Sequence, residues 1–187
     1  MMRLRLVSLG RRRLSTAAGP IPKAYALGGA SRGRAGCELR TSTGFAIATD
    51  VPRAAGGADE APQPVELMLA ALLGCKTATA HFVARQLWPR PRNRIERIEW
   101  RDVTAERDER GALALPIDAP PPVPAGLRLV RGVALVTPAA PRRADSGPPI
   151  AAADVAQLGS IVEERCPVAA MFAASGCEME IEWRLAG

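Results

Sequence analysis

The residues of this sequence best suited to chemistry are its four cysteines, Cys37, Cys75, Cys166 and Cys177. None of them belongs to a C-x-x-C pair, and His81 is the one histidine of the chain. Structural zinc sites use four Cys or His ligands with close, paired spacings, so the pattern argues against zinc, and neither a metal nor a cofactor is predicted. The thiols are therefore expected to be either buried side chains or chemically active groups.

Two of these cysteines stand in distinctive local sequences. Cys75 lies in the middle of an apolar helical stretch, where burial should disfavour the thiolate and leave the thiol inert. Cys166 precedes Pro167, which can open a new helix, so its thiol should lie near a helix N-terminus, where the dipole and free N–H groups favour a thiolate. On these grounds Cys166 is predicted to be the more acidic of the two, although a small buried side chain is the commoner fate of a free cysteine.

The element that positions Cys75 is a long helix predicted from Pro64 to about Leu87. Proline suits the first turn of a helix, and the acid at Glu66 suits the positive end of the helix dipole. The residues that follow are apolar on every face through two turns. A helix of this kind has to be buried on all sides, so it is predicted to be the central helix of the domain.

The remaining segments predict a mixed fold. With 48% hydrophobic and 24% charged residues the chain can bury a core, and 187 residues suffice for one domain. The order β-β-α-β-β-α-α-β has too few βα alternations for a doubly wound sheet, so the fold class is α+β. The predicted elements besides the central helix are a hairpin or meander in 22–50, strands at 95–104, 127–136 and 179–185, and helices at 151–164 and 168–174.

The N-terminal residues 1–20 differ in composition from the rest of the chain. They hold five arginines, no acidic residue and apolar residues spaced as in an amphipathic helix. This composition is typical of an organellar transit peptide, and we expect a mitochondrial destination, the matrix in particular, with a plastid as the alternative. Residues 21–187 are then the folded domain.

The net charge of +6 belongs largely to this leader. Residues 21–187 carry 20 basic against 19 acidic residues, and aromatic residues are 4% of the chain. A nucleic-acid surface needs a basic stripe with aromatic residues for base stacking, so no nucleic-acid partner is predicted. The chain contains no uncharged apolar run of roughly 18 residues, so no membrane span is predicted either.

Two cysteine motifs resemble those of the OsmC/Ohr family. The segment 50–75, DVPRAAGGADEAPQPVELMLAALLGC, resembles the family's Gly-Gly loop, helix-opening proline and central helix with its cysteine. The segment 162–168, VEERCPV, resembles the second motif, a cysteine followed by proline. The resemblance covers about residues 22–187, and its Ala/Leu-rich helix is nearer the general OsmC-like subgroup than the dedicated organic hydroperoxide reductases.

The resemblance implies a cysteine-based thiol peroxidase. Cys75 would attack an organic hydroperoxide and become a sulfenic acid, Cys166 would resolve it as a disulfide, and a dithiol such as a lipoyl group would reduce the enzyme. The family fold is an intertwined homodimer with its central helices wrapped by antiparallel sheet and its active sites at the subunit interface. An arginine of the N-terminal hairpin would face the peroxidatic thiol; the candidates are Arg32, Arg34 and Arg40, with Arg34 slightly favoured.

One departure from the family pattern concerns the acid that pairs with this arginine. In the reductases it directly follows the helix-opening proline, but here that position is Val65 and the acid is Glu66. One residue turns a helix by about 100°, so Glu66 is expected to point elsewhere and to cap the helix. This departure keeps an alternative open: a non-catalytic OsmC-like domain that binds a small apolar ligand or serves as a subunit of a larger mitochondrial assembly.

Overall fold

The computed structural model describes residues 19, 21–88, 94–140 and 148–187. The predicted leader, residues 1–20, lies outside the described residues except for Gly19. Its role in targeting stays a prediction. The described chain is α+β, as expected. Its elements are β1 (Leu27–Ser31), β2 (Cys37–Thr41), β3 (Ala46–Thr49), α1 (Pro64–Leu87), β4 (Ile95–Arg107), α2 (Arg110–Leu113), β5 (Leu127–Pro138), α3 (Ala152–Arg165), α4 (Pro167–Ala174) and β6 (Glu178–Leu185).

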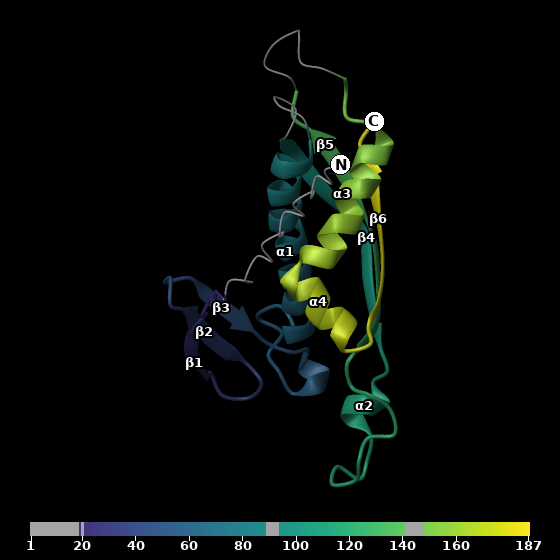
Figure 1. Cartoon of the computed structure of the whole chain (residues 1–187). Helices are drawn as coiled ribbons and strands as arrows, with labels where there is room; N and C mark the ends of the chain where they lie inside the picture. The colour runs from purple at the N-terminus through teal and green to yellow at the C-terminus, as the bar shows by residue number, and fades with distance from the viewer. Residues whose placement is uncertain (1–18, 20, 89–93, 141–147) are drawn as a thin grey trace, which may run out of the picture.

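The larger sheet has the order β4-β5-β6. β4 and β5 pair antiparallel, as predicted, with an irregularity at Asp102, whose φ is +51°. The antiparallel sheet expected from the family resemblance is found for β4 and β5, whereas β5 and β6 run parallel. Parallel neighbours need a long crossover connection, which α3 and α4 provide on one face of the sheet (Figure 1).

The smaller sheet is a meander of β1, β2 and β3, all antiparallel. It lies beside the first half of α1, on the side away from the larger sheet (Figure 1). Every residue of β1 is exposed, and β2 alternates exposed and half-buried residues. This three-stranded sheet buries little apolar surface against the rest of its own chain. A sheet of this size is stable only when an apolar face packs against something.

Asp50 organises the loop between the small sheet and α1. Its buried carboxylate accepts hydrogen bonds from the N–H groups of Val51, Ala58 and Glu60, at 2.8, 3.1 and 3.2 Å. The bond from Val51 is the main reason that the pKa of Asp50 lies below its ordinary value. A Cβ at Gly57 would lie 1.9 Å from the Val51 carbonyl oxygen, so this tight loop requires glycine there.

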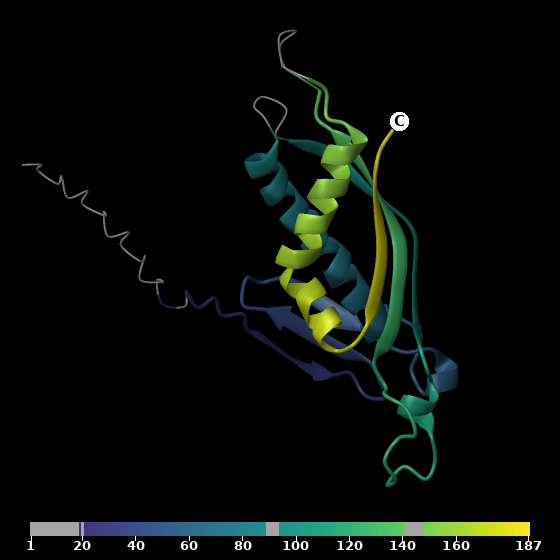
Figure 2. The same ribbon diagram turned by 45° about the vertical axis from the view of Figure 1, so that its right-hand side comes forward.

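The helix α1 is covered on one side by α3, α4 and β4 (Figure 2). Its buried residues are Leu72, Lys76, Ala80, Val83 and Ala84. The prediction that α1 is buried on all sides is therefore wrong for the single chain, because one chain covers one face only. By length and apolar composition alone α1 resembles a membrane-spanning helix, a property that core helices of soluble proteins share.

Two apolar clusters fill the space between the helices and the larger sheet. One joins the second half of α1 to α3, and the other joins the first half of α1 to α4 and contains Cys166 and Cys177, with Cys75 packed against it. Both halves of α1 are therefore tied to the α3–α4 segment. This packing brings Cys75 against the apolar cluster that contains Cys166.

Gly159 of α3 lets the helix lie close against Trp183 of β6. A Cβ at this position would lie 2.4 Å from the indole ring. We predict that Gly159→Ala lowers the free energy of unfolding, because overpacking a core costs about 1–3 kcal/mol. That loss outweighs the gain of roughly 1 kcal/mol that alanine brings over glycine in a helix. Thermal and urea unfolding measure the change.

Ser160→Ala is the matched control, since Ser160 is the exposed next residue of the same helix. Its unfolding free energy should stay within about 0.5 kcal/mol of the wild type. A Gly159→Ala protein as stable as the wild type would contradict the close packing.

Candidate active site

Cys75 occupies the edge of the covered face of α1. Its side chain is half-buried, whereas Leu72 and Lys76, its neighbours on the covered face, are fully buried. The helix begins at Pro64, where the Gln63 N–H donates to Glu66 Oε2 at 2.8 Å. The regular helix then carries Cys75 to the level of the α3–α4 junction. Its thiol is therefore placed by the register of α1 rather than by a flexible loop.

Cys166 lies where α3 ends and α4 begins. The residue before a proline avoids helical backbone angles, and Cys166 is extended, with φ −76° and ψ 115°. Its N–H still donates to the Val162 carbonyl, and its thiol accepts from the Ala169 N–H at 3.5 Å. The thiol thus caps α4, in agreement with the prediction that it lies at a helix N-terminus.

Cys75 packs against the apolar cluster that contains Cys166, so the two thiols lie close enough for Cys75 to influence the pKa of Cys166. Burial is the main cause that raises the pKa of Cys166 above its ordinary value, and the facing Cys75 thiol adds to the rise. The Ala169 N–H acts in the opposite direction but does not cancel it. The expectation that the helix terminus favours a Cys166 thiolate is therefore wrong, because complete burial outweighs the effect of the helix terminus.

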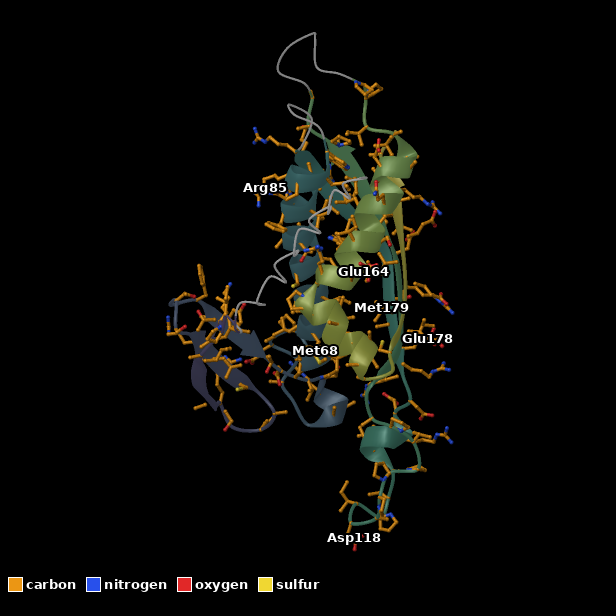
Figure 3. The ribbon with its side chains drawn as sticks, viewed as in Figure 1. Met68, Arg85, Asp118, Glu164, Glu178 and Met179 are labelled. Atoms are coloured by element: carbon orange, nitrogen blue, oxygen red, sulfur yellow. The ribbon has the colours of Figure 1, made fainter. Side chains whose placement is uncertain are left out.

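An apolar groove runs between the first half of α1 and α4 and has a volume of about 470 Å³. Ala71 of the groove lies one turn before Cys75, so the groove and Cys75 share one face of α1. Figure 3 shows Met68, one of its walls, on α1 beside α4. Its lining residues are Met68, Ala71, Gly126, Leu127, Val168, Met171, Phe172 and Ser175.

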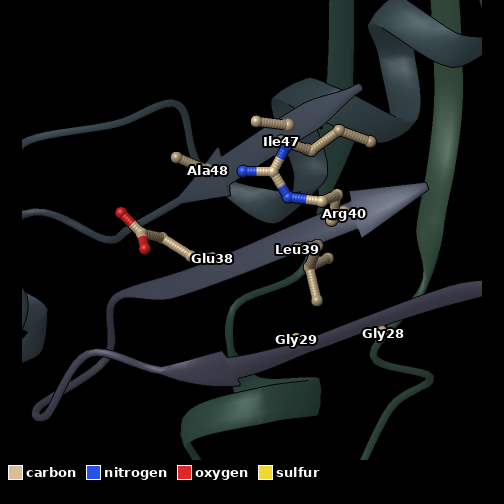
Figure 4. A pocket seen from close by; sticks show the side chains of 8 residues that line it. Gly28, Gly29, Glu38, Leu39, Arg40, Ile47 and Ala48 are labelled. Atoms are coloured by element: carbon tan, nitrogen blue, oxygen red, sulfur yellow. The ribbon is translucent and has the colours of Figure 1, made fainter. Parts of the chain in front are cut away.

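The arginine candidates lie on the small sheet. Arg32 pairs with Glu38 at 3.2 Å. Arg40 reaches from β2 toward β3 (Figure 4) and donates to a carbonyl of the β2–β3 turn. Arg34 is exposed in the β1–β2 turn, with φ +47°. Among the described residues, none of these arginines makes a hydrogen bond or ion pair with a cysteine. Their roles stay predictions.

Glu66 also lies away from the thiols within the chain. It is exposed and caps α1, nine residues before Cys75, which is roughly 13 Å along the helix axis. The helix-capping position agrees with the expectation drawn from its one-residue displacement. A role for Glu66 beside the thiol stays a prediction.

Sequence reasoning missed the ion pair that adjoins the two cysteines. Lys76, completely buried, binds Glu163, whose side chain is 32% exposed. Lys76 directly follows Cys75, and Glu163 lies one turn before Cys166. The sequence did offer one signal for Lys76. It directly follows the apolar run of the central helix, and the sequence has only one other lysine, Lys23. In the described ranges no group of three or more His, Cys, Asp and Glu side chains could hold a metal.

The sequence profile of the OsmC-like proteins matches residues 56–182, which include α1, both site cysteines and the ion pair. The chain belongs to the OsmC-like protein family. No curated protein sequence matches this OsmC-like chain significantly.

Solved structures of other OsmC-like proteins share the fold. An OsmC-like protein from Mycoplasma pneumoniae is 17% identical with a TM-score of 0.65, covering 89% of this chain and 100% of its own. An organic hydroperoxide resistance protein OsmC from Legionella pneumophila is 15% identical with a TM-score of 0.57, covering 90% and 100%. The organic hydroperoxide resistance protein OhrB of Bacillus subtilis is 17% identical with a TM-score of 0.51, covering 88% and 98%. At such identities the likeness establishes the fold.

Burial of the thiols predicts a loss of stability at alkaline pH. Burial raises the pKa of Cys166 and of Cys177, so the unfolded chain releases these protons at a lower pH than the folded chain. Above about pH 8.5 the unfolded state then binds fewer protons, and the free energy of unfolding falls as pH rises. The fall is at most about 1.4 kcal/mol per pH unit for each thiol. Urea unfolding between pH 7.5 and 10 under a reductant measures it.

Cys166→Ala should make this fall less steep, and Cys37→Ala, which removes a thiol from the small sheet, is the matched control. An equal slope in the wild type and in Cys166→Ala would show that Cys166 titrates alike in the folded and unfolded chains.

Proposed function

We propose that this OsmC-like protein is a thiol peroxidase that reduces organic hydroperoxides. The observation that carries the proposal is the proximity of Cys75 and Cys166 within one apolar cluster, with an apolar groove along the same helix α1. The proposal requires that these two thiols form a disulfide with little movement of the backbone. Cys75 is the proposed nucleophile because it is half-buried and lies on the groove side of α1, whereas Cys166 is fully buried.

The proposed reaction has three steps. The Cys75 thiolate attacks the outer oxygen of the hydroperoxide, the O–O bond breaks, and the leaving alkoxide takes a proton to become an alcohol. Cys75 is thereby oxidised to a sulfenic acid. The Cys166 thiol then attacks this sulfur, forming the Cys75–Cys166 disulfide and releasing water. A small dithiol, such as a lipoyl group, reduces the disulfide by thiol exchange and leaves as its own disulfide.

The groove supplies the preference for an organic substrate. Its walls are methionine, phenylalanine, valine and leucine side chains, which favour an alkyl or aryl group over water. Because Met68 and Met171 are flexible side chains, the groove can adapt to substrates of different shape. Hydrogen peroxide has no apolar part to place there, so it should be the poorer substrate.

A second copy of the chain is proposed to complete the structure. The uncovered face of α1 carries Ala70, Gly74, Ala78 and Phe82, spaced one turn apart, and all four are exposed. Small residues at this spacing allow two helices to approach closely. The small sheet also leaves apolar side chains without cover. The large apolar residues exposed on these two surfaces include Tyr25, Leu27, Phe45 and Phe82.

The same homodimer would supply the charge that activates Cys75. Lys76 is already neutralised by Glu163, so within the site the nearest cation has little charge to offer a thiolate. The small sheet is free to pack on the partner, and we propose that Arg34 of the second copy then faces Cys75. Glu66 would orient this arginine from the start of α1.

The alternative is a non-catalytic OsmC-like domain that binds a small apolar ligand in the same groove, alone or within a mitochondrial assembly. Two observations favour it: Glu66 is occupied as a helix cap, and Cys166 is not acidic. The two functions differ in one measurable respect, since only the peroxidase needs the sulfur of Cys75.

We predict rapid consumption of cumene hydroperoxide by the reduced wild type and almost none by Cys75→Ser, because a serine hydroxyl does not attack the O–O bond. Cys166→Ser should complete one turnover and hold a sulfenic acid on Cys75, because the resolving thiol is missing. Stopped-flow kinetics and a sulfenic-acid probe with mass spectrometry measure both effects.

Cys37→Ser is the matched control and should keep the wild-type rate. Equal, slow consumption by the wild type and Cys75→Ser would rule out the peroxidase and favour the ligand-binding domain.

We also predict that the protein sediments at about twice the chain mass at micromolar concentration. Ala78→Arg should shift it toward the monomer, because a charged side chain then lies in the middle of the uncovered face of α1. Ala156→Arg makes the same change on the exposed side of α3 and should leave the dimer intact. Sedimentation equilibrium distinguishes these states, and a well-folded wild-type monomer would contradict the shared core.

A further inference from the structure

We propose that the ion pair between the buried Lys76 and the partly exposed Glu163 is a positioning device that holds Cys166 opposite Cys75. The inference rests on the proposed function, since it concerns the step in which Cys166 resolves Cys75. Lys76 and Glu163 act through the cysteines and touch neither substrate nor reductant.

The ion pair and the two cysteines occupy matching positions on α1 and α3. Cys75 and Lys76 are consecutive residues of α1, and Glu163 and Cys166 are one turn apart at the end of α3. The ion pair Lys76–Glu163 and the thiol pair Cys75–Cys166 are therefore neighbouring links between the same two segments. A slide or rotation of α3 against α1 cannot separate the thiols without also breaking the ion pair.

The ion pair is itself held in place by a residue of the larger sheet. Trp183 of β6 donates its indole N–H to the other oxygen of Glu163, at 3.4 Å. The Trp183 ring meets Trp100 of β4 edge-on, with centroids 5.6 Å apart. Trp100 in turn donates to the Thr77 hydroxyl at 3.1 Å.

The two residues after Cys75 are thus bound to three other elements. Lys76 is bound to α3, while Thr77 is bound to β4 and, through the paired indoles, lies next to β6. Hydrogen bonds and ion pairs are directional, so this network selects one register of α1 against α3. Apolar packing alone does not impose such a register.

The burial of Lys76 carries an energetic cost. Taking a lysine completely out of water carries a desolvation penalty that often equals or exceeds the attraction of its partner, so replacing a buried pair with apolar residues is often neutral or stabilising. Stability alone therefore does not account for Lys76 in an otherwise apolar helix. The best-attested use of such buried polar groups is to fix register.

The test measures the equilibrium between the Cys75–Cys166 disulfide and its dithiol in glutathione redox buffers, by alkylation and mass spectrometry of the full chain. This measurement of the disulfide equilibrium needs no peroxide and is independent of peroxidase activity. We expect Lys76→Met and Glu163→Gln to lower the equilibrium constant for the disulfide at least tenfold, a potential change of about 30 mV for two electrons.

The double variant Lys76→Met/Glu163→Met separates positioning from stability. It leaves no charge unpaired, so we expect its resistance to urea to return toward the wild type while its disulfide equilibrium stays at least tenfold weaker. Val155→Ala is the matched control, since it removes a buried side chain from the same helix α3 away from the thiols. It should lower stability and leave the disulfide equilibrium within twofold of the wild type.

The inference is overturned if the disulfide equilibrium follows stability across all these variants, or if the double variant recovers both. A wild type that forms no Cys75–Cys166 disulfide in glutathione also overturns it. Failure of the proposed function has a different signature: no peroxide consumption by a wild type whose disulfide equilibrium still depends on Lys76 and Glu163.

Discussion

Close packing of α3 against α1 is the interaction on which the rest of the structure depends. The second half of α1 presents small residues, Ala80 and Ala84, to the apolar face of α3, so the two helices can approach closely. On its other side α3 lies against Trp183, where Gly159 leaves room for the ring. Packing α3 in this way brings the helix break at Cys166 toward α1, and the Lys76–Glu163 ion pair is proposed to set the register that places the Cys166 thiol opposite Cys75.

Much of the fold could be predicted from local signals. Pro64, the apolar run after it and Pro167 mark helix ends that the structure places within a residue or two of the prediction. The parallel pairing of β5 with β6 was missed because strand direction depends on the α3–α4 crossover, which sequence periodicity does not report. The covering of α1 was also overestimated, since an apolar helix face shows that a partner is needed but does not say which chain supplies it.

Site residues that belong to local motifs could be predicted from the sequence. Contacts between residues far apart in the chain could not. Cys75 and Cys166 could be paired through the family resemblance, whereas Lys76 and Glu163, 87 residues apart, carry no local signal of their contact. The acidity of Cys166 was predicted from its helix terminus alone. Because the side chain is completely buried, desolvation reverses the sign, and sequence spacing does not reveal the depth of burial.

The same desolvation links the proposed catalysis to the proposed dimer. A buried thiol reacts as a nucleophile only when a nearby positive charge compensates the loss of water around its thiolate. The ion pair beside the thiols is neutral overall, and the small sheet that carries Arg34 lies on the uncovered side of its own chain. A second copy of the chain would cover the open face of α1. The positive charge of its Arg34 would at the same time favour the Cys75 thiolate. An isolated chain, even when well folded, should therefore be a poor peroxidase.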